Sequence, residues 1–102
     1  MTYPTPVYVG RFDPVKAGDI VDLYIDIEAD LADGETVSSC AFTVTNSAAA
    51  TVAGVVGAHT ETAARTDFRI TAPAATGDYQ IAAVFTVSDG QKITRIAAVR
   101  VV

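Results

Sequence analysis

Carboxylates gather in residues 19–39, a stretch that holds seven of the twelve Asp and Glu residues and no Lys or Arg. Closely spaced carboxylate oxygens are the ligands that calcium prefers in proteins. An EF-hand is excluded, because placing Gly34 at the EF-hand glycine leaves three ligand positions without a carboxylate. Only a looser calcium site remains as a candidate, made of Asp30, Asp33 and Glu35. We expect no cofactor and no bound metal beyond this candidate.

His59 and Cys40 are the only histidine and the only cysteine. A catalytic histidine needs carboxylate or histidine partners, and Glu61 is the only one nearby in the sequence. We therefore predict that His59 is a polar residue of a loop or strand end. Cys40 alternates with Phe42 and Val44, which indicates a small buried side chain. No nucleophile or phosphate-binding motif is present, so we predict that the protein is not an enzyme.

The net charge of −5 and a pI near 4.5 argue against binding to nucleic acid or to an anionic membrane. No run of 18 apolar residues occurs, and the N-terminal residues lack the pattern of a signal peptide. At 102 residues the chain is expected to form one domain, residues 1–102. Residues 1–6 form a possible N-terminal arm; Tyr3 within it and Tyr8 just after it are candidate partner-binding residues.

Valine (14), threonine (13) and alanine (18) dominate the composition, whereas there are only two leucines. β-Branched residues favour strands, so this composition predicts an all-β protein. The clearest strand covers residues 19–28, where Val21, Leu23, Ile25 and Ile27 alternate with polar residues. The polar positions form an acidic, solvent-facing surface that is suited to a basic partner. Its candidate partner-binding residues are Asp22, Tyr24 and Asp26.

Further strands are predicted at residues 6–12, 36–46 and 67–71, and in a C-terminal hairpin that turns at residues 88–90. The two prolines near the first strand suggest an edge position. Residues 46–66 are ambiguous: one or two short strands around residues 50–56, or a helical turn at residues 48–50. In the last strand, Arg95 falls on the apolar face. Either a bulge moves it outward, or Ile96 and Ala98 supply the core instead.

Short strands with a turn signal every 8–12 residues predict an immunoglobulin-like antiparallel β-sandwich of about seven strands. Tyr79, at the start of a long strand before the final hairpin, resembles the tyrosine that packs at a corner of immunoglobulin-like domains. The sequence lacks the Cys, Trp and Cys pattern of antibody domains.

The sequence resembles a known family in four features. These are the strand with Asp22 and Tyr24, the turn after it, the strand beginning near Tyr79 and the Ser88-Asp89-Gly90 hairpin. The family is that of the small immunoglobulin-like virion proteins of tailed bacteriophages, of the head-decoration, head-fibre or minor-capsid type. The resemblance covers residues 13–102 and rests on strand alternation and turn residues.

The resemblance implies a non-enzymatic structural protein of a phage virion, made in the bacterial cytoplasm. The role that the resemblance implies first is that of a head-decoration protein. Such a protein is bound in many copies, or as a homo-oligomer, to the major capsid protein or to other virion proteins. The alternatives are a neck, collar or fibre component, and an adhesin module that binds carbohydrate of the host surface.

Overall fold

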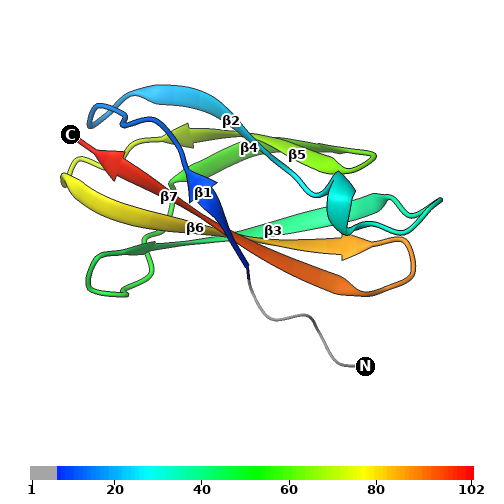
Figure 1. The fold of residues 1–102 in the computed structure, drawn as a ribbon. Coiled ribbons are helices and arrows are strands. Elements are labelled where there is room, and N and C mark those ends of the chain that lie inside the picture. Colours follow the sequence, from blue (N-terminus) through cyan, green and yellow to red (C-terminus); the bar gives the residue numbers. More distant parts are fainter. Residues whose placement is uncertain (1–6) are drawn as a thin grey trace.

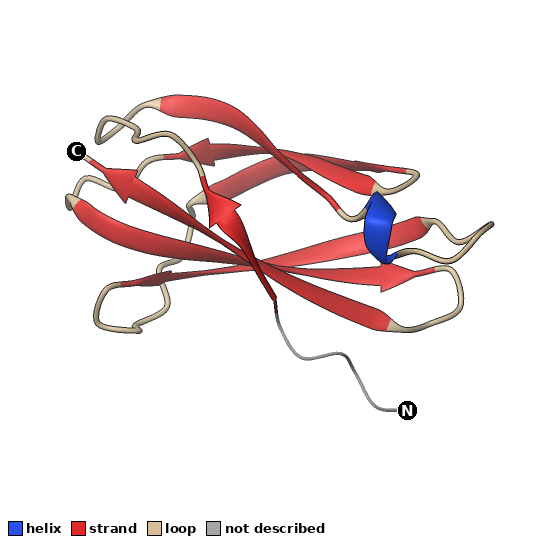
Figure 2. Cartoon of the chain, in the orientation of Figure 1, coloured by secondary structure: helices blue, strands red, loops and turns tan. Residues whose placement is uncertain are grey.

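The computed structural model describes residues 7–102, which form two β-sheets packed face to face (Figure 1). The strands are β1 (Val7–Arg11), β2 (Ile20–Asp26), β3 (Val37–Asn46), β4 (Val56–Thr62), β5 (Arg65–Thr71), β6 (Gly77–Val87) and β7 (Lys92–Val101). One sheet has the order β1-β7-β6-β3 and the other has the order β2-β5-β4. A single 3₁₀ turn, η1 (Glu28–Asp30), is the only helical element among the described residues (Figure 2). The prediction of an all-β sandwich of about seven strands is confirmed.

Six of the seven strands are ordered as in an immunoglobulin domain, whereas β1 lies beside β7. Strands β2, β5 and β4 take the places of strands B, E and D, whereas β3, β6 and β7 take those of strands C, F and G. The first strand lies at the edge of the four-stranded sheet, as its prolines suggested. It pairs with β7 in parallel, from Val7 opposite Arg95 to Arg11 opposite Ala98. This pair departs from the predicted antiparallel arrangement, because both strands run toward the same end of the sandwich.

Alternation along the strands builds the core between the two sheets. In β6, every second residue from Tyr79 to Val87 is buried, and Phe85 is fully buried. Phe68 of β5 is buried in the other sheet, and its ring centroid lies 4.9 Å from that of Phe42 in β3. The corner predicted for Tyr79 is present, since its hydroxyl donates a hydrogen bond to the Ala75 carbonyl at 2.6 Å. A tyrosine that bonds back across the E–F corner is typical of immunoglobulin-like sandwiches.

Two ambiguous regions are resolved by the structure. The strand in residues 46–66 is β4, which begins only at Val56, so the predicted position around residues 50–56 is wrong; residues 48–50 form a turn instead of a helix. The register of β4 with β5 shifts between Val56 and His59. The prediction of His59 in a loop or at a strand end is wrong, because His59 lies in the middle of β4 and is paired with Phe68 of β5. In β7, pairing with β6 is continuous through Arg95, so no bulge occurs there. Arg95 stays on the core face, with 6 % of its surface exposed.

Candidate partner-binding face

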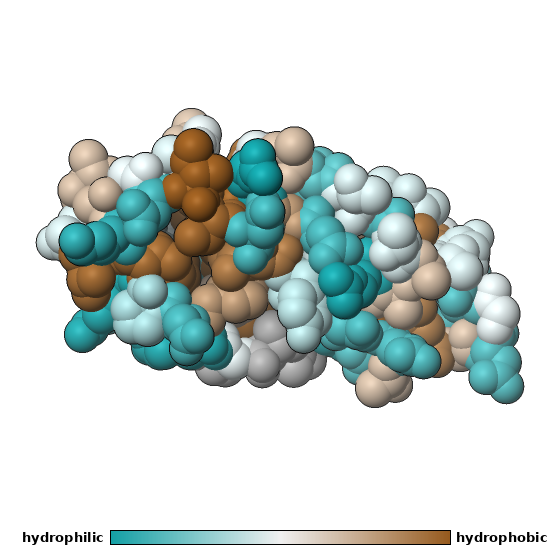
Figure 3. Space-filling view, turned by 90° about the horizontal axis from the view of Figure 1, so that it is seen from above, coloured by the Kyte–Doolittle hydropathy of each residue, from teal (hydrophilic) through white to brown (hydrophobic). Residues whose placement is uncertain are grey.

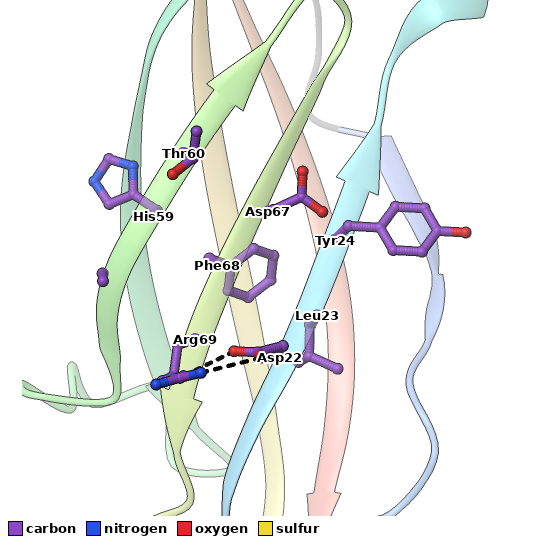
Figure 4. Close-up of a pocket in the computed structure, with 9 residues that line it drawn as sticks. Asp22, Leu23, Tyr24, His59, Thr60, Asp67, Phe68 and Arg69 are labelled. Atoms are coloured by element: carbon purple, nitrogen blue, oxygen red, sulfur yellow. Dashed lines mark hydrogen bonds and ion pairs between the residues drawn. The ribbon is translucent and has the colours of Figure 1, made fainter.

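The outer face of the three-stranded sheet brings the predicted strand residues of β2 against charged residues of β5. In the antiparallel register, Asp22 lies opposite Arg69, Tyr24 opposite Asp67 and Asp26 opposite Arg65. Cross-strand neighbours on one face have Cβ atoms about 5 Å apart, so these side chains interact directly. Figure 4 shows Asp22 and Arg69 joined in this way, with Phe68 turned behind them toward the core.

Asp22 and Arg69 form a two-pronged ion pair across the strands. The Arg69 Nε donates to Asp22 Oδ1 at 2.8 Å, and Nη2 donates to Oδ2 at 3.2 Å. These hydrogen bonds from the guanidinium lower the pKa of the Asp22 carboxyl below its usual value. Both side chains are well exposed, so the pair contributes little to stability and chiefly fixes the direction of the two groups.

Tyr24 and Arg65 form the second part of this face. The Arg65 guanidinium lies over the Tyr24 ring, 4.4 Å from its centroid, in a cation–π arrangement. The same guanidinium binds Asp67 through both oxygens, with an Nε–Oδ2 distance of 3.0 Å. Hydrogen bonding from Arg65 lowers the pKa of Asp67. Tyr24 remains 55 % exposed and stands out from the surface toward solvent.

The expectation of a uniformly acidic face is therefore wrong. Arg65 and Arg69 of β5 alternate with the carboxylates of β2, so the surface is a ladder of opposite charges. Figure 3 looks onto the molecule from this side: polar side chains are spread along it, whereas apolar ones gather toward the end where the C-terminus lies. The exposed side chains of Ile20 and Val102 are apolar.

The three calcium candidates are not brought together. Asp30 binds the buried guanidinium of Arg95, with 3.0 Å between Oδ1 and Nη2. Glu35 accepts a hydrogen bond from the Ala32 amide at 2.8 Å, and it lines a hollow with Asp33 that Asp30 does not reach. Within residues 7–102, no group of three or more His, Cys, Asp or Glu side chains is arranged to hold a metal ion.

Tyr3 lies outside the described residues, and Tyr8 belongs to the edge strand β1. His59 lines a hollow between β3 and β4, whereas Cys40 of β3 is buried. His59 Nδ1 is 2.7 Å from Glu61 Oε2, and the His59 ring packs on the edge of Phe42. Burial, together with the nearby Glu61 carboxylate, raises the pKa of the Cys40 thiol to about 12, so this cysteine is unsuited to nucleophilic chemistry.

Three residues of the face, Arg65, Asp67 and Arg69, were missed by the sequence reasoning. Their spacing of two residues beside buried Phe68 and Ile70 marks them as one outward face of a strand. That signal was available, but nothing in the sequence indicates that this strand pairs with β2.

Fold and site together define a small structural β-sandwich domain with a charged contact face. The family model described as podophage GP4 fiber-tail adaptor protein gp77 matches residues 16–100, and the chain belongs to this family. Comparison with curated proteins finds no match. The prediction of a small phage virion protein is supported at this level, although the family's description names a fiber-tail adaptor and not a head-decoration protein. No helix among the described residues is long and apolar enough to cross a membrane.

Proposed function

We propose that this protein is a non-enzymatic structural adaptor of a phage virion that joins a tail protein to a fibre protein. The observation that carries the proposal is the family match over residues 16–100, whose description is that of a fiber-tail adaptor. Of the functions considered from the sequence, the neck, collar or fibre component agrees best with this description. Head decoration, with the major capsid protein as partner, has no comparable support.

The outer face of β2, β5 and β4 is the surface that we assign to the partner. Tyr24 and two arginines are residue types that are enriched in protein interfaces and in their binding hot spots. The ion pairs of Arg65 and Arg69 hold these side chains in fixed directions before a partner arrives, which reduces the entropy lost on binding. A partner would present its own charges in the complementary order, and this order supplies specificity more than affinity.

The carbohydrate-binding alternative is less favoured by the same geometry. A sugar ring stacks on the open face of an aromatic side chain, but the Arg65 guanidinium already covers one face of Tyr24. Moreover, within residues 10–102, Tyr24 is the only aromatic residue among the exposed large apolar side chains.

The test is a deletion of the gene for this chain in the phage that encodes it. An adaptor predicts particles with filled heads and complete tails that lack fibres, and complementation with the wild-type chain should restore the fibres. Mass spectrometry of separated heads and tails should place the chain in the tail fraction. The proposal is wrong if the chain purifies with fibreless heads and the deletion leaves the fibre content of the particles unchanged.

A further inference from the structure

Strand β3 leaves a short stretch of its free edge unpaired. It pairs with β6 on one side and is the last strand of the four-stranded sheet. At one end of this edge, the Val37 amide donates to the Ala63 carbonyl. At the other end, the Val52 amide donates to the Val44 carbonyl. The chain itself therefore closes both ends, and residues 38–43 between them have no neighbouring strand within the described part of the chain.

The direction of the free backbone groups follows from these bonds. The Val44 carbonyl and the Asn46 amide both point away from β6, toward residues 50–52. Backbone groups alternate with a period of two along a strand, and the pairing of β3 is regular from Ser39 onward. Hence Phe42 and Cys40 also direct their N–H and C=O groups out of the sheet at the open edge.

The open part of this edge lacks two common protections against pairing, charged residues and proline. Natural edge strands commonly carry charged residues or proline to prevent addition of a further strand. The sequence of residues 38–43, SSCAFT, contains no charge, no proline and no glycine. The two edges of the other sheet are different: β2 carries Asp22 and Asp26, and β4 carries Glu61. An uncharged edge also lets a protein of net charge −5 approach a second copy without opposing carboxylates.

A hollow lies beside the open edge, between β3 and β4. It is lined by Phe42 and His59, whose ring centroids are 5.1 Å apart, and by the buried side chain of Val55. The Phe42 side chain points to the inner side of its sheet and is only partly buried. An added strand would place every second side chain on this inner side, and an aromatic one would meet the rings of Phe42 and His59.

We propose that residues 2–6 of a second copy of this chain add as a strand to the open edge of β3. The segment Thr2-Tyr3-Pro4-Thr5-Pro6 is uncharged, and its length matches the edge. Pro4 and Pro6 lack an N–H, but in a strand they share one side, so Tyr3 and Thr5 direct their donors to the other side. The segment can therefore pair on one side only, and its prolines stop further strands from adding.

In this arrangement Tyr3 and Thr5 exchange hydrogen bonds with Phe42 and Cys40, while Pro4 lies across from Ala41. Side chains of directly opposite residues share one face of a sheet. The Tyr3 ring is thus placed on the inner side of the sheet, against the packed rings of Phe42 and His59, which gives the bound segment specificity in addition to its backbone hydrogen bonds.

The segment must come from another copy. Val7, where β1 begins, is aligned across the sheet with Arg95, then Ala83, then Phe42. Three strand spacings of about 4.8 Å separate these ends, roughly 14 Å in all. The four residues from Tyr3 to Val7 span at most about 14 Å, so the chain's own segment could only cross the sheet and could not lie along β3. Pairing of unlike surfaces joins copies head to tail, into a chain or a closed ring.

The first test uses a double variant that carries both P4C and A41C. In the proposed arrangement, the thiol introduced at position 4 of one copy lies across from the thiol introduced at position 41 of the next copy. A pair across a sheet ladder is close enough for a disulfide, so oxidation of the concentrated double variant should give a ladder of covalent oligomers on a denaturing gel. The matched control combines P4C with T60C, because Thr60 is exposed on the edge strand of the other sheet. This control and each single variant should give no ladder beyond a dimer. A ladder that is equally strong in the control would overturn the proposal.

The second test compares two proline substitutions by sedimentation of the isolated chain. Thr5→Pro removes a donor that faces β3 and should weaken self-association by about tenfold, as expected for one hydrogen bond. Thr2→Pro makes the same change on the side that faces solvent, and should leave self-association unchanged. The proposal is contradicted if the wild-type chain stays monomeric up to millimolar concentration. It is also contradicted if T5P self-associates as strongly as the wild type. Both experiments use the isolated chain, so their outcome is independent of the adaptor role.

Discussion

The guanidinium of Arg95, buried on the core face of β7, is bound by the carboxylate of Asp30 in the η1 turn. Nη2 lies 3.0 Å from Oδ1, Nε lies 3.3 Å from Oδ2, and Nη1 donates to the Thr94 carbonyl at 2.9 Å. The Arg95 side chain is 7 % exposed, whereas that of Asp30 is 42 % exposed. The pair thus connects the loop after β2 with the last strand of the opposite sheet, at one end of the core.

Removing Asp30 should destabilise the fold because it leaves a buried positive charge without its counter-ion. We expect Asp30→Ala to lower the free energy of unfolding by roughly 1–3 kcal/mol, less than for a fully buried pair because water can reach this position. Asp33→Ala in the same loop is the control and should change stability by less than about 0.5 kcal/mol. Urea denaturation of both variants measures the difference; equal midpoints would show that the Arg95 charge is solvated by other groups. Arg95→Met, which removes the charge itself, should be much milder than Asp30→Ala.

Arg95 also shows where the sequence stops being informative. Alternation alone puts Ile93, Arg95 and Ala97 on one face, and the structure has this arrangement. Both solutions expected from the sequence, a bulge at Arg95 and a core made by Ile96 and Ala98, are wrong. The sequence could not decide whether a charge on that face is tolerated, because the answer depends on a carboxylate 65 residues away. A bulge would have removed the charge from the core by a local change of the backbone. The protein instead keeps Arg95 in place and neutralises its charge with Asp30, a residue distant in the sequence.

The Tyr79 hydroxyl should stabilise the corner before β6. It donates to the Ala75 carbonyl at 2.6 Å, and the rest of the side chain is buried. Tyr79→Phe keeps the packing but leaves that carbonyl without its partner, so we expect a loss of roughly 1–2 kcal/mol in the free energy of unfolding. Tyr24→Phe, at an exposed tyrosine, should be close to neutral in the same measurement. Similar losses in both variants would mean that the corner hydrogen bond contributes nothing specific.

Of the candidate partner-binding face, only the residues of β2 could be predicted from the sequence. The alternation of residues 19–28 placed Asp22, Tyr24 and Asp26 on one exposed surface, and the structure agrees. Their neighbours were not predictable, because the pairing of β2 with β5 joins Asp22, Tyr24 and Asp26 to residues 39 to 47 positions away. Without that register the carboxylates looked uncompensated, and the face was assigned to a basic partner. The arginines of β5 change it into a surface of mixed charge.

Reversing one charge of the ladder should impair partner binding with little effect on folding. Arg69→Glu places two carboxylates opposite each other on the proposed contact face, whereas Arg100→Glu does the same at the Asp78–Arg100 pair of the other sheet. We expect R69E to reduce incorporation of the chain into particles and R100E to be incorporated normally. The free energy of unfolding of both variants should lie within about 1 kcal/mol of the wild-type value, because exposed ion pairs contribute little to stability. Normal incorporation of R69E would remove this face from the proposed role.

Acid should destabilise the fold through the carboxylates that arginines bind. Hydrogen bonds from Arg69, Arg65 and Arg100 lower the pKa values of Asp22, Asp67 and Asp78 in the folded state. Because the unfolded carboxyls titrate near about 3.9, the stabilisation is complete above that pH and is lost as pH falls through the lower folded values.

The measurement is the melting temperature between pH 7 and pH 3, which should be flat at first and fall below about pH 4. The decrease should be small and should shrink further in high salt, because the pairs are exposed. Asp78→Asn lacks one of these groups and should show a weaker dependence on pH than the wild type. Parallel curves for the two proteins would argue against a contribution from Asp78.

The Cys40 thiol should be unreactive in the folded protein. Its pKa is raised to about 12, first by burial and then by the nearby Glu61 carboxylate. Compared with a thiol of ordinary pKa, it forms on the order of a thousandfold less thiolate at pH 8, which is the species that attacks a disulfide reagent. Titration with such a reagent should therefore show almost no reaction until urea unfolds the chain. The variant Ala41→Cys adds an exposed thiol at the adjacent position, and it should react once, quickly, in the native state while Cys40 stays protected. Fast reaction of wild-type Cys40 without denaturant would mean that the opening between β3 and β4 admits the reagent to the core.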